Sequence, residues 1–181
     1  TTRLVGSEMC IRDSFWSLGN ESYAGDILVE MNRYYKEKDP DRLVHYEGVA
    51  ENRPYEDLIS DMESQMYASP EKIKEYLENN PKKPFILCEY MHDMGNSLGG
   101  MESYIRLLDQ YEDYQGGFIW DYIDQALFVK DEVTGRDVLR YGGDFDDRPS
   151  DYEFSGNGIL FADRTEKPAM QEVRHYYGLR R

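Results

Sequence analysis

Residues 85–96 read FILCEYMHDMGN, an apolar run that ends in a cluster of polar residues. Four apolar residues after Pro84 are typical of a strand that is buried on both faces of a parallel sheet. The polar residues and Gly95 indicate a turn at the carboxyl end of that strand. Glu89 therefore stands where a strand holds the backbone and a loop gives access, which is where α/β folds carry chemical groups. A strand-end glutamate that only pairs with a neighbour is the structural alternative.

A second stretch, residues 15–22 (FWSLGNES), has the same design. A short apolar strand is followed by Glu21, with the amide of Asn20 beside it. Glycoside hydrolysis needs two carboxyl groups, a protonated one for the leaving oxygen and an ionised one for the anomeric carbon. Two strand-end glutamates with room for strands and helices between them match that requirement. If the two lie close together, their repulsion keeps one protonated near neutrality.

The composition argues against several classes of partner. The 181 residues carry a formal net charge of −15, which disfavours nucleic acid and anionic membranes. No stretch is long and apolar enough to span a membrane, and we expect a cytoplasmic protein. Cys10 and Cys88 show no metal or disulfide spacing, so a reduced buried thiol is expected at Cys88. Aromatic residues make up 14% of the chain, which is compatible with a sugar-binding cleft.

Strand and helix patterns alternate along the chain. Apolar residues at three- and four-residue intervals predict helices over 25–38 and 98–111, and Ser69 and Pro70 are expected to begin a helix that covers 71–79. Glu47, at a strand end, is interpreted as a supporting residue and His45 as a structural one. Residues 49–60 are predicted as a loop with at most a short turn, and the segment after 121 as loops and hairpin strands. The other predicted elements are strands over 14–18, 43–46, 61–66 and 118–120, and a closing helix over 168–177.

Several segments together resemble the β-galactosidases of glycoside hydrolase family two. In chain order they are WSLGNES at 16–22, ILCEY at 86–90 with His92, MGNSLGG at 94–100, QGGFIWD at 115–121 and YGGDF at 141–145. Asn-Glu at a strand end is shared by a whole clan of glycosidases, whereas the Cys-Glu-Tyr-x-His and Met-Gly-Asn-Ser block is much narrower. The resemblance runs in the same order and with similar spacing from about residue 15 to about residue 177.

The resemblance implies an α/β fold, namely strands four to eight of a (β/α)₈ TIM barrel followed by an irregular segment of loops and hairpins. Because a complete barrel typically needs about 250 residues, residues 14–181 are expected to be the carboxyl-terminal part of the catalytic barrel of a longer protein. Residues 1–13 match neither a regular element nor the family, and we interpret them as a foreign leader. The chain by itself is expected to be inactive.

The same resemblance implies a retaining glycosidase that cleaves terminal β-D-galactosides such as lactose. Glu89 is then the nucleophile, and Glu21 is the acid that acts as the base in the second step. For Tyr67 and Trp120, ordinary buried aromatic residues are the alternative interpretation. The residues that the resemblance assigns to substrate binding are Asn20, Met66, Tyr67, His92, Trp120 and Asn157.

The family also uses a divalent cation, usually magnesium (Mg²⁺), and a monovalent cation such as sodium (Na⁺). The resemblance assigns Glu21 to magnesium, together with partners that precede it in the family and have no match in this sequence. The carbonyl of Phe154 and the side chain of Asn157 match the sodium site, but the family's aspartate from its amino-terminal domains has no counterpart here. The full-length enzyme is expected to form homo-oligomers.

Other functions remain open at this point. Within the family, β-glucuronidase and β-mannosidase are the alternatives, and a non-catalytic carbohydrate-binding domain is another. Glu89 and His92, like Glu172 and His175, also have the Glu-x-x-His spacing of di-iron sites in ferritin-like bundles. Pro84 and Gly95 argue against that site, since they leave no room for a long helix around the first pair.

Overall fold

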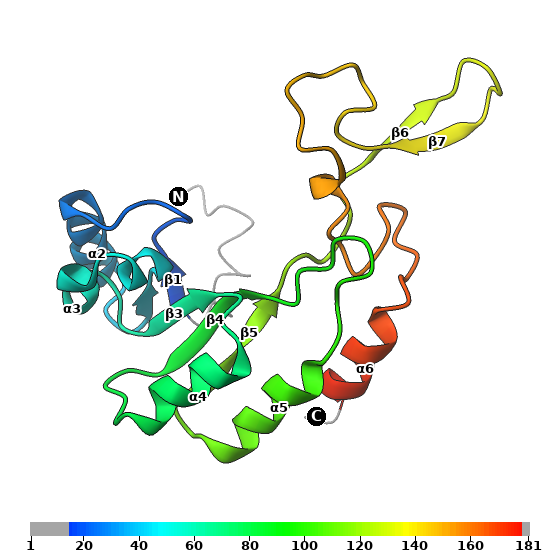
Figure 1. Cartoon of the computed structure of the whole chain (residues 1–181). Coiled ribbons are helices and arrows are strands. Elements are labelled where there is room, and N and C mark those ends of the chain that lie inside the picture. The colour runs from blue at the N-terminus through cyan, green and yellow to red at the C-terminus, as the bar shows by residue number, and fades with distance from the viewer. Residues whose placement is uncertain (1–14, 179–181) are drawn as a thin grey trace.

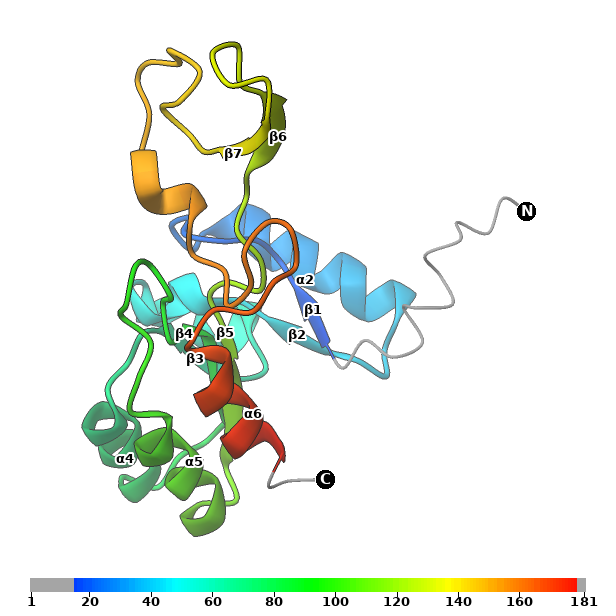
Figure 2. The ribbon, with the colours of Figure 1, turned by 90° about the vertical axis from the view of Figure 1, so that its right-hand side faces the viewer.

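The computed structural model describes residues 15–178, in which strands and helices alternate (Figure 1). The first five strands are β1 (Phe15–Ser17), β2 (Leu43–His45), β3 (Glu63–Met66), β4 (Phe85–Tyr90) and β5 (Tyr114–Ile119). The helices are α2 (Asp26–Lys38), α3 (Glu56–Ile59), α4 (Pro70–Glu78), α5 (Met101–Gln110) and α6 (Met170–Gly178), with 3₁₀ turns η1 (Glu47–Ala50), η2 (Arg53–Tyr55) and η3 (Tyr152–Ser155). A hairpin of β6 (Leu127–Lys130) and β7 (Asp137–Arg140) projects from the rest, as Figures 1 and 2 show.

These five strands form two sheets, and within each sheet the strands are parallel and follow one another in chain order. β1 pairs with β2, and β3, β4 and β5 form a three-stranded sheet. The N–H of Asp61 donates to the carbonyl of Val44 at 2.8 Å, which links β2 to the segment before β3. Phe15 on β1 and Phe118 on β5 pack edge to face with ring centroids 6.0 Å apart. Side chains of the first and fifth strands therefore meet, so the strands curve around a common interior, and the α/β class is confirmed.

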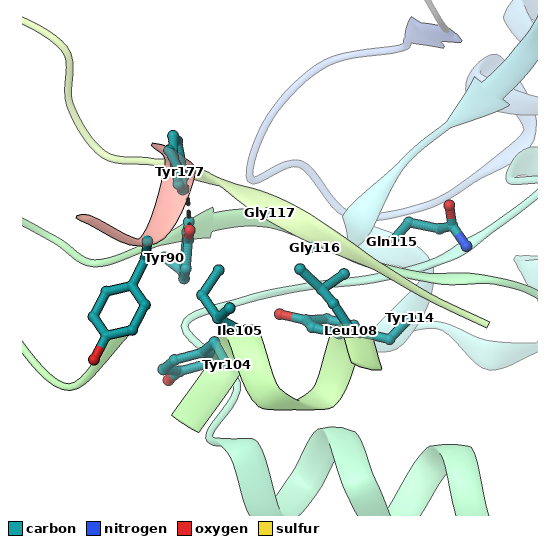
Figure 3. Close-up of a pocket in the computed structure, with 10 residues that line it drawn as sticks. Tyr90, Tyr104, Ile105, Leu108, Tyr114, Gln115, Gly116, Gly117 and Tyr177 are labelled. Atoms are coloured by element: carbon teal, nitrogen blue, oxygen red, sulfur yellow. Dashed lines mark hydrogen bonds between the residues drawn. The ribbon is translucent and has the colours of Figure 1, made fainter. Parts of the chain in front are cut away.

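Helices cover the outer face of this curved arrangement. Figures 1 and 2 show α4, α5 and α6 on one side of β3, β4 and β5. Between α5, β5 and α6 lies a cavity of about 270 Å³ in which Tyr90 and Tyr177 share a hydrogen bond of 2.8 Å between their hydroxyls (Figure 3). The core beneath these helices consists of Ala68, Ile73, Leu77, Phe85, Leu87, Tyr90, Met101, Leu107, Tyr114, Ile159, Leu160 and Val173. A second cluster joins α2 to β2, and it consists of Leu18, Ala24, Leu28, Val29, Val44, Tyr46, Val49 and Ile59.

β4 is the central strand of the three-stranded sheet. Phe85, Ile86 and Leu87 are buried, as predicted for a strand covered on both faces. At its neighbour β5, a Cβ on Gly117 would lie 2.7 Å from the Cβ of Leu87. Only glycine allows these two strands to approach so closely, because any side chain at residue 117 would displace β4.

Two predicted elements differ from the observed ones. The sequence predicts the final strand over 118–120, but β5 begins at Tyr114 and ends at Ile119. The predicted loop over 49–60 contains η2 and α3, and Lys83 donates hydrogen bonds to the carbonyls of Glu56 and Ser60 at 2.7 and 2.8 Å. Both differences have the same cause, since contacts with distant parts of the chain stabilise backbone that lacks a local signal.

The other predicted elements are confirmed, with ends that shift by at most three residues. Ser69 caps α4 by accepting the N–H of Lys72, and Pro70 is the first helical residue, as predicted. None of the helices within residues 15–178 is both long and apolar enough to cross a membrane. The proposed leader, residues 1–13, lies outside the described residues.

Candidate active site

Glu21 lies in the turn that follows β1, with its side chain exposed. Its backbone has a φ of 51°, a left-handed conformation that residues other than glycine seldom adopt. The N–H of Glu21 donates to Oε1 of Glu47 at 2.6 Å, and the N–H of Ser22 donates to the hydroxyl of Tyr46 at 2.9 Å. Side chains at the end of β2 thus hold the backbone that carries Glu21.

Gly48 allows the turns after β1 and β2 to pack together. A Cβ on this residue would lie 2.5 Å from the carbonyl oxygen of Ser22 and 2.6 Å from the ring of Tyr46. A main-chain oxygen cannot rotate aside as a flexible side chain can, so a larger residue here would push away the turn that carries Glu21. The Glu-Gly pair at 47–48 therefore supports Glu21 through a hydrogen bond and through close packing.

Glu89 lies near the carboxyl end of β4, as predicted, and its carboxylate is bound by Tyr67. The Tyr67 hydroxyl donates to Oε2 of Glu89 at 2.6 Å, and the Tyr67 N–H donates to the Glu89 carbonyl at 2.9 Å. Burial raises the pKa of Tyr67, and the hydrogen bond and charge of Glu89 raise it further, with a smaller contribution from Glu21. Because the phenol keeps its proton at neutral pH, it remains a donor to Glu89.

Two cavities meet at the buried side chain of Glu47. The larger, about 420 Å³, is lined by Glu21, Glu47 and Met66 among others, and Met66 pairs with Glu89 in the register of β3 and β4. The smaller, about 220 Å³, is lined by Asn20, Glu47 and Glu89 among others. The predicted site residues at the ends of β1, β3 and β4 therefore lie around one buried carboxylate, that of Glu47.

His92 and Trp120 lie on the turns after β4 and β5. The His92 ring lies 5.6 Å from the ring of Tyr67 and 5.9 Å from that of Phe154, centroid to centroid. Trp120 is half-buried, and its carbonyl accepts the N–H of Asp93 at 2.8 Å. His92 therefore adjoins the Tyr67 that binds Glu89, whereas Trp120 is joined to this turn through its backbone.

Phe154 and Asn157 do not present two oxygens to a monovalent cation. Asn157 is buried, and its Nδ2 donates to the Phe154 carbonyl, so the amide turns its nitrogen toward that oxygen. Within the described part of the chain, Oδ1 of Asn157 has no hydrogen-bond partner. In this arrangement the two residues do not fit a monovalent cation.

Among the described residues, Glu21 lacks the partners that a magnesium site needs. Within residues 15–178, no set of three or more His, Cys, Asp or Glu ligand atoms gathers around this residue. One exposed carboxylate does not make a site for Mg²⁺, which is held by several oxygen ligands in octahedral geometry. We therefore assign Glu21 no role in metal binding from the structure.

Tyr46 is the supporting residue that the sequence did not indicate. It is fully buried, and its hydroxyl both accepts the N–H of Ser22 and donates to the Ser22 carbonyl. A tyrosine at the end of a strand carries no local signal for this contact, because the partner precedes it by a whole helix. Its position directly before Glu47 and Gly48 is the one feature that could have drawn attention to it.

Comparison with known proteins identifies the family. Residues 14–180 match the family model "Glycosyl hydrolases family 2, TIM barrel domain". The chain is 74% identical over 164 residues to the beta-galactosidase large subunit of Latilactobacillus sakei and 70% identical over 165 residues to that of Lactobacillus helveticus, in each case over 91% of this chain and 26% of the relative. It therefore spans about a quarter of the length of these relatives. The resemblance found in the sequence is confirmed, and the chain belongs to the TIM barrel domain of glycosyl hydrolase family 2.

Proposed function

We propose that this chain carries the two catalytic glutamates of a retaining β-galactosidase. In this proposal the chain is part of a longer polypeptide, and it supplies strands four to eight of the barrel. The two relatives above are named beta-galactosidase large subunits. The observation that carries the proposal is the hydrogen bond of 2.6 Å that Tyr67 donates to Glu89. Glu89 and Glu21 line two cavities that share the buried side chain of Glu47. A phenol that stays protonated stabilises an ionised carboxylate and orients it, which is what a nucleophile requires.

In the proposed reaction Glu89 attacks the anomeric carbon while the carboxyl group of Glu21 gives its proton to the departing glycosidic oxygen. The bond from the sugar to the aglycone breaks, and an ester between the sugar and Glu89 forms. Glu21, now a carboxylate, takes a proton from water, whose oxygen attacks the anomeric carbon and releases Glu89. The product keeps the β configuration because two inversions follow one another.

Asn20, Met66 and His92 are proposed to contact the sugar. Asn20 lines the same cavity as Glu89, so its amide can reach the hydroxyl next to the anomeric carbon, an interaction that strengthens in the transition state. His92 lies beside Tyr67 and can bind a further hydroxyl. Trp120 and Asn157, on the turns beyond β5, are proposed to complete the far side of the sugar site.

The charges around the two cavities favour a neutral sugar over a glucuronide. A glucuronide carries a carboxylate, which needs a cationic partner in the site. Among the described residues that line the two cavities, the one cation is Arg53, and it forms ion pairs with Glu63 at 2.6 Å and Glu56 at 3.1 Å. Its charge is thus already paired.

We therefore expect the full-length enzyme to hydrolyse a p-nitrophenyl β-galactoside at least about a hundredfold faster, in kcat/KM, than the corresponding glucuronide. The rates are measured by release of nitrophenol, with the β-mannoside as a third substrate. Because the leaving group is the same in all three, the comparison isolates recognition of the sugar. Preference for the glucuronide would contradict the proposed substrate class.

Removal of the Tyr67 hydroxyl tests the contact on which the proposal rests. Tyr67→Phe should lower kcat for a β-galactoside by about 10²- to 10³-fold, the loss typical of one preorganised hydrogen bond in an active site. The matched control is Tyr55→Phe, because the Tyr55 hydroxyl also donates to a carboxylate, that of Asp26 at 2.9 Å, on the surface. Equal rates for the two variants would show that the bond to Glu89 does not contribute to catalysis.

A further inference from the structure

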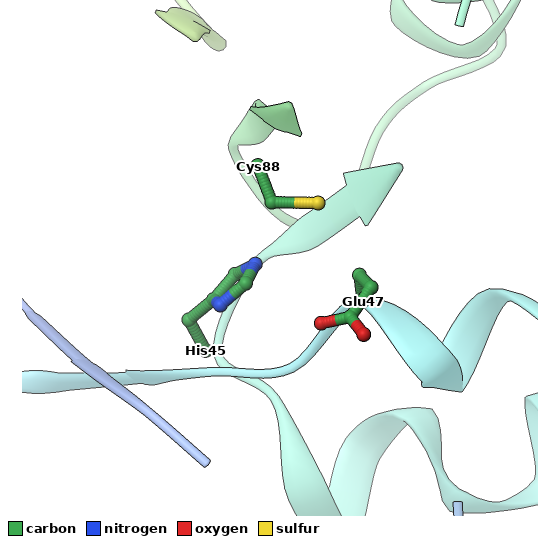
Figure 4. Close-up of side chains that lie close together, drawn as sticks. All are labelled: His45, Glu47 and Cys88. Atoms are coloured by element: carbon green, nitrogen blue, oxygen red, sulfur yellow. The ribbon is translucent and has the colours of Figure 1, made fainter. Parts of the chain in front are cut away.

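Three potential metal ligands converge beneath the two glutamates. His45 ends β2, Glu47 begins η1 and Cys88 lies on β4, and Figure 4 shows their side chains directed toward a common space. One ligand atom from each residue lies within 4.8 Å of those from the other two. His45 and Glu47 are buried and Cys88 is partly buried, so this is not a chance grouping of exposed charges.

The imidazole of His45 is available as a neutral ligand. Burial lowers the pKa of His45 to about 4, so the ring is uncharged at neutral pH. Its Nδ1 lies 3.0 Å from the hydroxyl of Ser17, and its Nε2 lies 2.7 Å from the hydroxyl of Ser64. If one nitrogen binds a metal, the serine on the other nitrogen can hold the ring's orientation and tautomer, as the partners of metal-bound histidines do.

The thiol of Cys88 and the carboxylate of Glu47 complete the set. Burial raises the pKa of Cys88 to about 11, so the thiol carries its proton when no cation is near. A metal that binds the sulfur must displace that proton. Glu47 uses Oε1 to accept the N–H of Glu21 at 2.6 Å, and its second oxygen is the candidate ligand atom that need not disturb this bond.

The geometry suits zinc better than a hard cation. Zinc bonds of about 2.0 to 2.3 Å at tetrahedral angles separate the ligand atoms by roughly 3.4 to 3.6 Å. Atoms that already lie within 4.8 Å of one another reach this arrangement by small side-chain rotations. A thiolate with an imidazole is a ligand set for zinc, whereas magnesium and calcium prefer oxygen ligands.

We propose that His45, Glu47 and Cys88 form a zinc site with a fourth position open to water, and that zinc bound there inhibits the enzyme. The inhibition rests on the proposed function, whereas the binding does not. Glu47 and Cys88 line the same cavity as Glu89, so a divalent charge there would attract the carboxylate of the nucleophile.

Binding is tested with cobalt(II), a coloured probe for zinc sites, added to the 181-residue chain in a Cys10→Ser background. Because Cys10 is the other cysteine of the sequence, a thiolate-to-cobalt charge-transfer band in this background reports Cys88. We expect the band in the parent, its loss in Cys88→Ser and in His45→Gln, and its retention in the control His175→Gln, which changes an exposed histidine. Added zinc should bleach it by displacing the cobalt.

The affinity for zinc, measured by equilibrium dialysis, should fall by at least about a hundredfold in Cys88→Ser. Near-ultraviolet circular dichroism of the metal-free variants shows whether each keeps the tertiary structure of its parent. Absence of the band in the parent, or its persistence in Cys88→Ser, would overturn the site. If the band behaves as expected but zinc leaves galactoside hydrolysis by the full-length enzyme unchanged, the inhibitory role is wrong while the site stands.

Discussion

Glu89→Gln in the full-length enzyme should lower kcat for β-galactosides by roughly 10⁴-fold or more, the scale of loss when a reacting group is removed from a catalytic set. The amide has nearly the same shape as the carboxylate, and it can still accept the hydrogen bond that Tyr67 donates to Glu89 at 2.6 Å. It cannot attack the anomeric carbon, because its oxygen carries no charge and its nitrogen is not nucleophilic. The loss therefore measures nucleophilic attack rather than a change of fold.

A 2-fluoro-galactoside with a good leaving group provides the direct assay for this role. The fluorine slows both steps, but the leaving group keeps the first one fast enough for the sugar to accumulate on the nucleophile. Peptide mass spectrometry should find the label on Glu89 in the parent and no label in Glu89→Gln. Glu132→Gln, which changes an exposed glutamate at the β6–β7 turn, is the control and should label normally. A label on any other residue would contradict the assignment.

The second large effect is expected from Glu21→Gln, and it should depend on the leaving group. Loss of the proton donor should slow hydrolysis of lactose by about 10²- to 10⁴-fold, the usual contribution of general acid catalysis. A dinitrophenyl galactoside needs no proton on its leaving oxygen, so its first step should be nearly as fast as in the parent. The second step lacks its base, and the intermediate on Glu89 should accumulate.

Rapid mixing with the dinitrophenyl substrate measures the accumulation of the intermediate, which appears as a burst of dinitrophenol followed by slow turnover. The burst should match the enzyme concentration in Glu21→Gln and be absent in Glu89→Gln, which forms no intermediate. The two variants are thus expected to give opposite burst results. That difference distinguishes the roles of Glu21 and Glu89 more sharply than the size of the loss of activity in either variant. An equal fall in kcat/KM, which reports the first step, for lactose and for the dinitrophenyl substrate would contradict the role of Glu21 as the acid.

The local pattern of the sequence was sufficient to place the two glutamates. An apolar run before a polar turn indicates a strand end wherever it occurs, and β1 and β4 both end close to where that pattern predicts. Glu21 and Glu89 thus lie at strand ends, as expected. Ser69 and Pro70 likewise defined the start of α4, because capping depends on residues that are neighbours in the chain.

The sequence was less informative where distant contacts stabilise the backbone. The glycines before Phe118 have the pattern of a turn, yet they belong to β5, since Gly117 must pack against Leu87 of the neighbouring strand. α3 has only four residues and no side-chain cap, and the ammonium of Lys83 supports it from beyond the next strand and helix by donating to the carbonyl of Glu56. Propensity is a weak guide in such segments, because tertiary packing overrides it.

The sequence alone was enough to predict the α/β class, the order of strands and helices, the family, and the two strand ends near which the glutamates lie. The three-dimensional fold was needed to show which side chains meet there: Tyr67 with Glu89, Glu47 with the backbone of Glu21, and His45 with Glu47 and Cys88. Periodicity and capping encode interactions between residues that are only a few positions apart in the chain. Contacts between strands that are separated by a helix depend instead on register and on close packing, and the local pattern of residues does not record either.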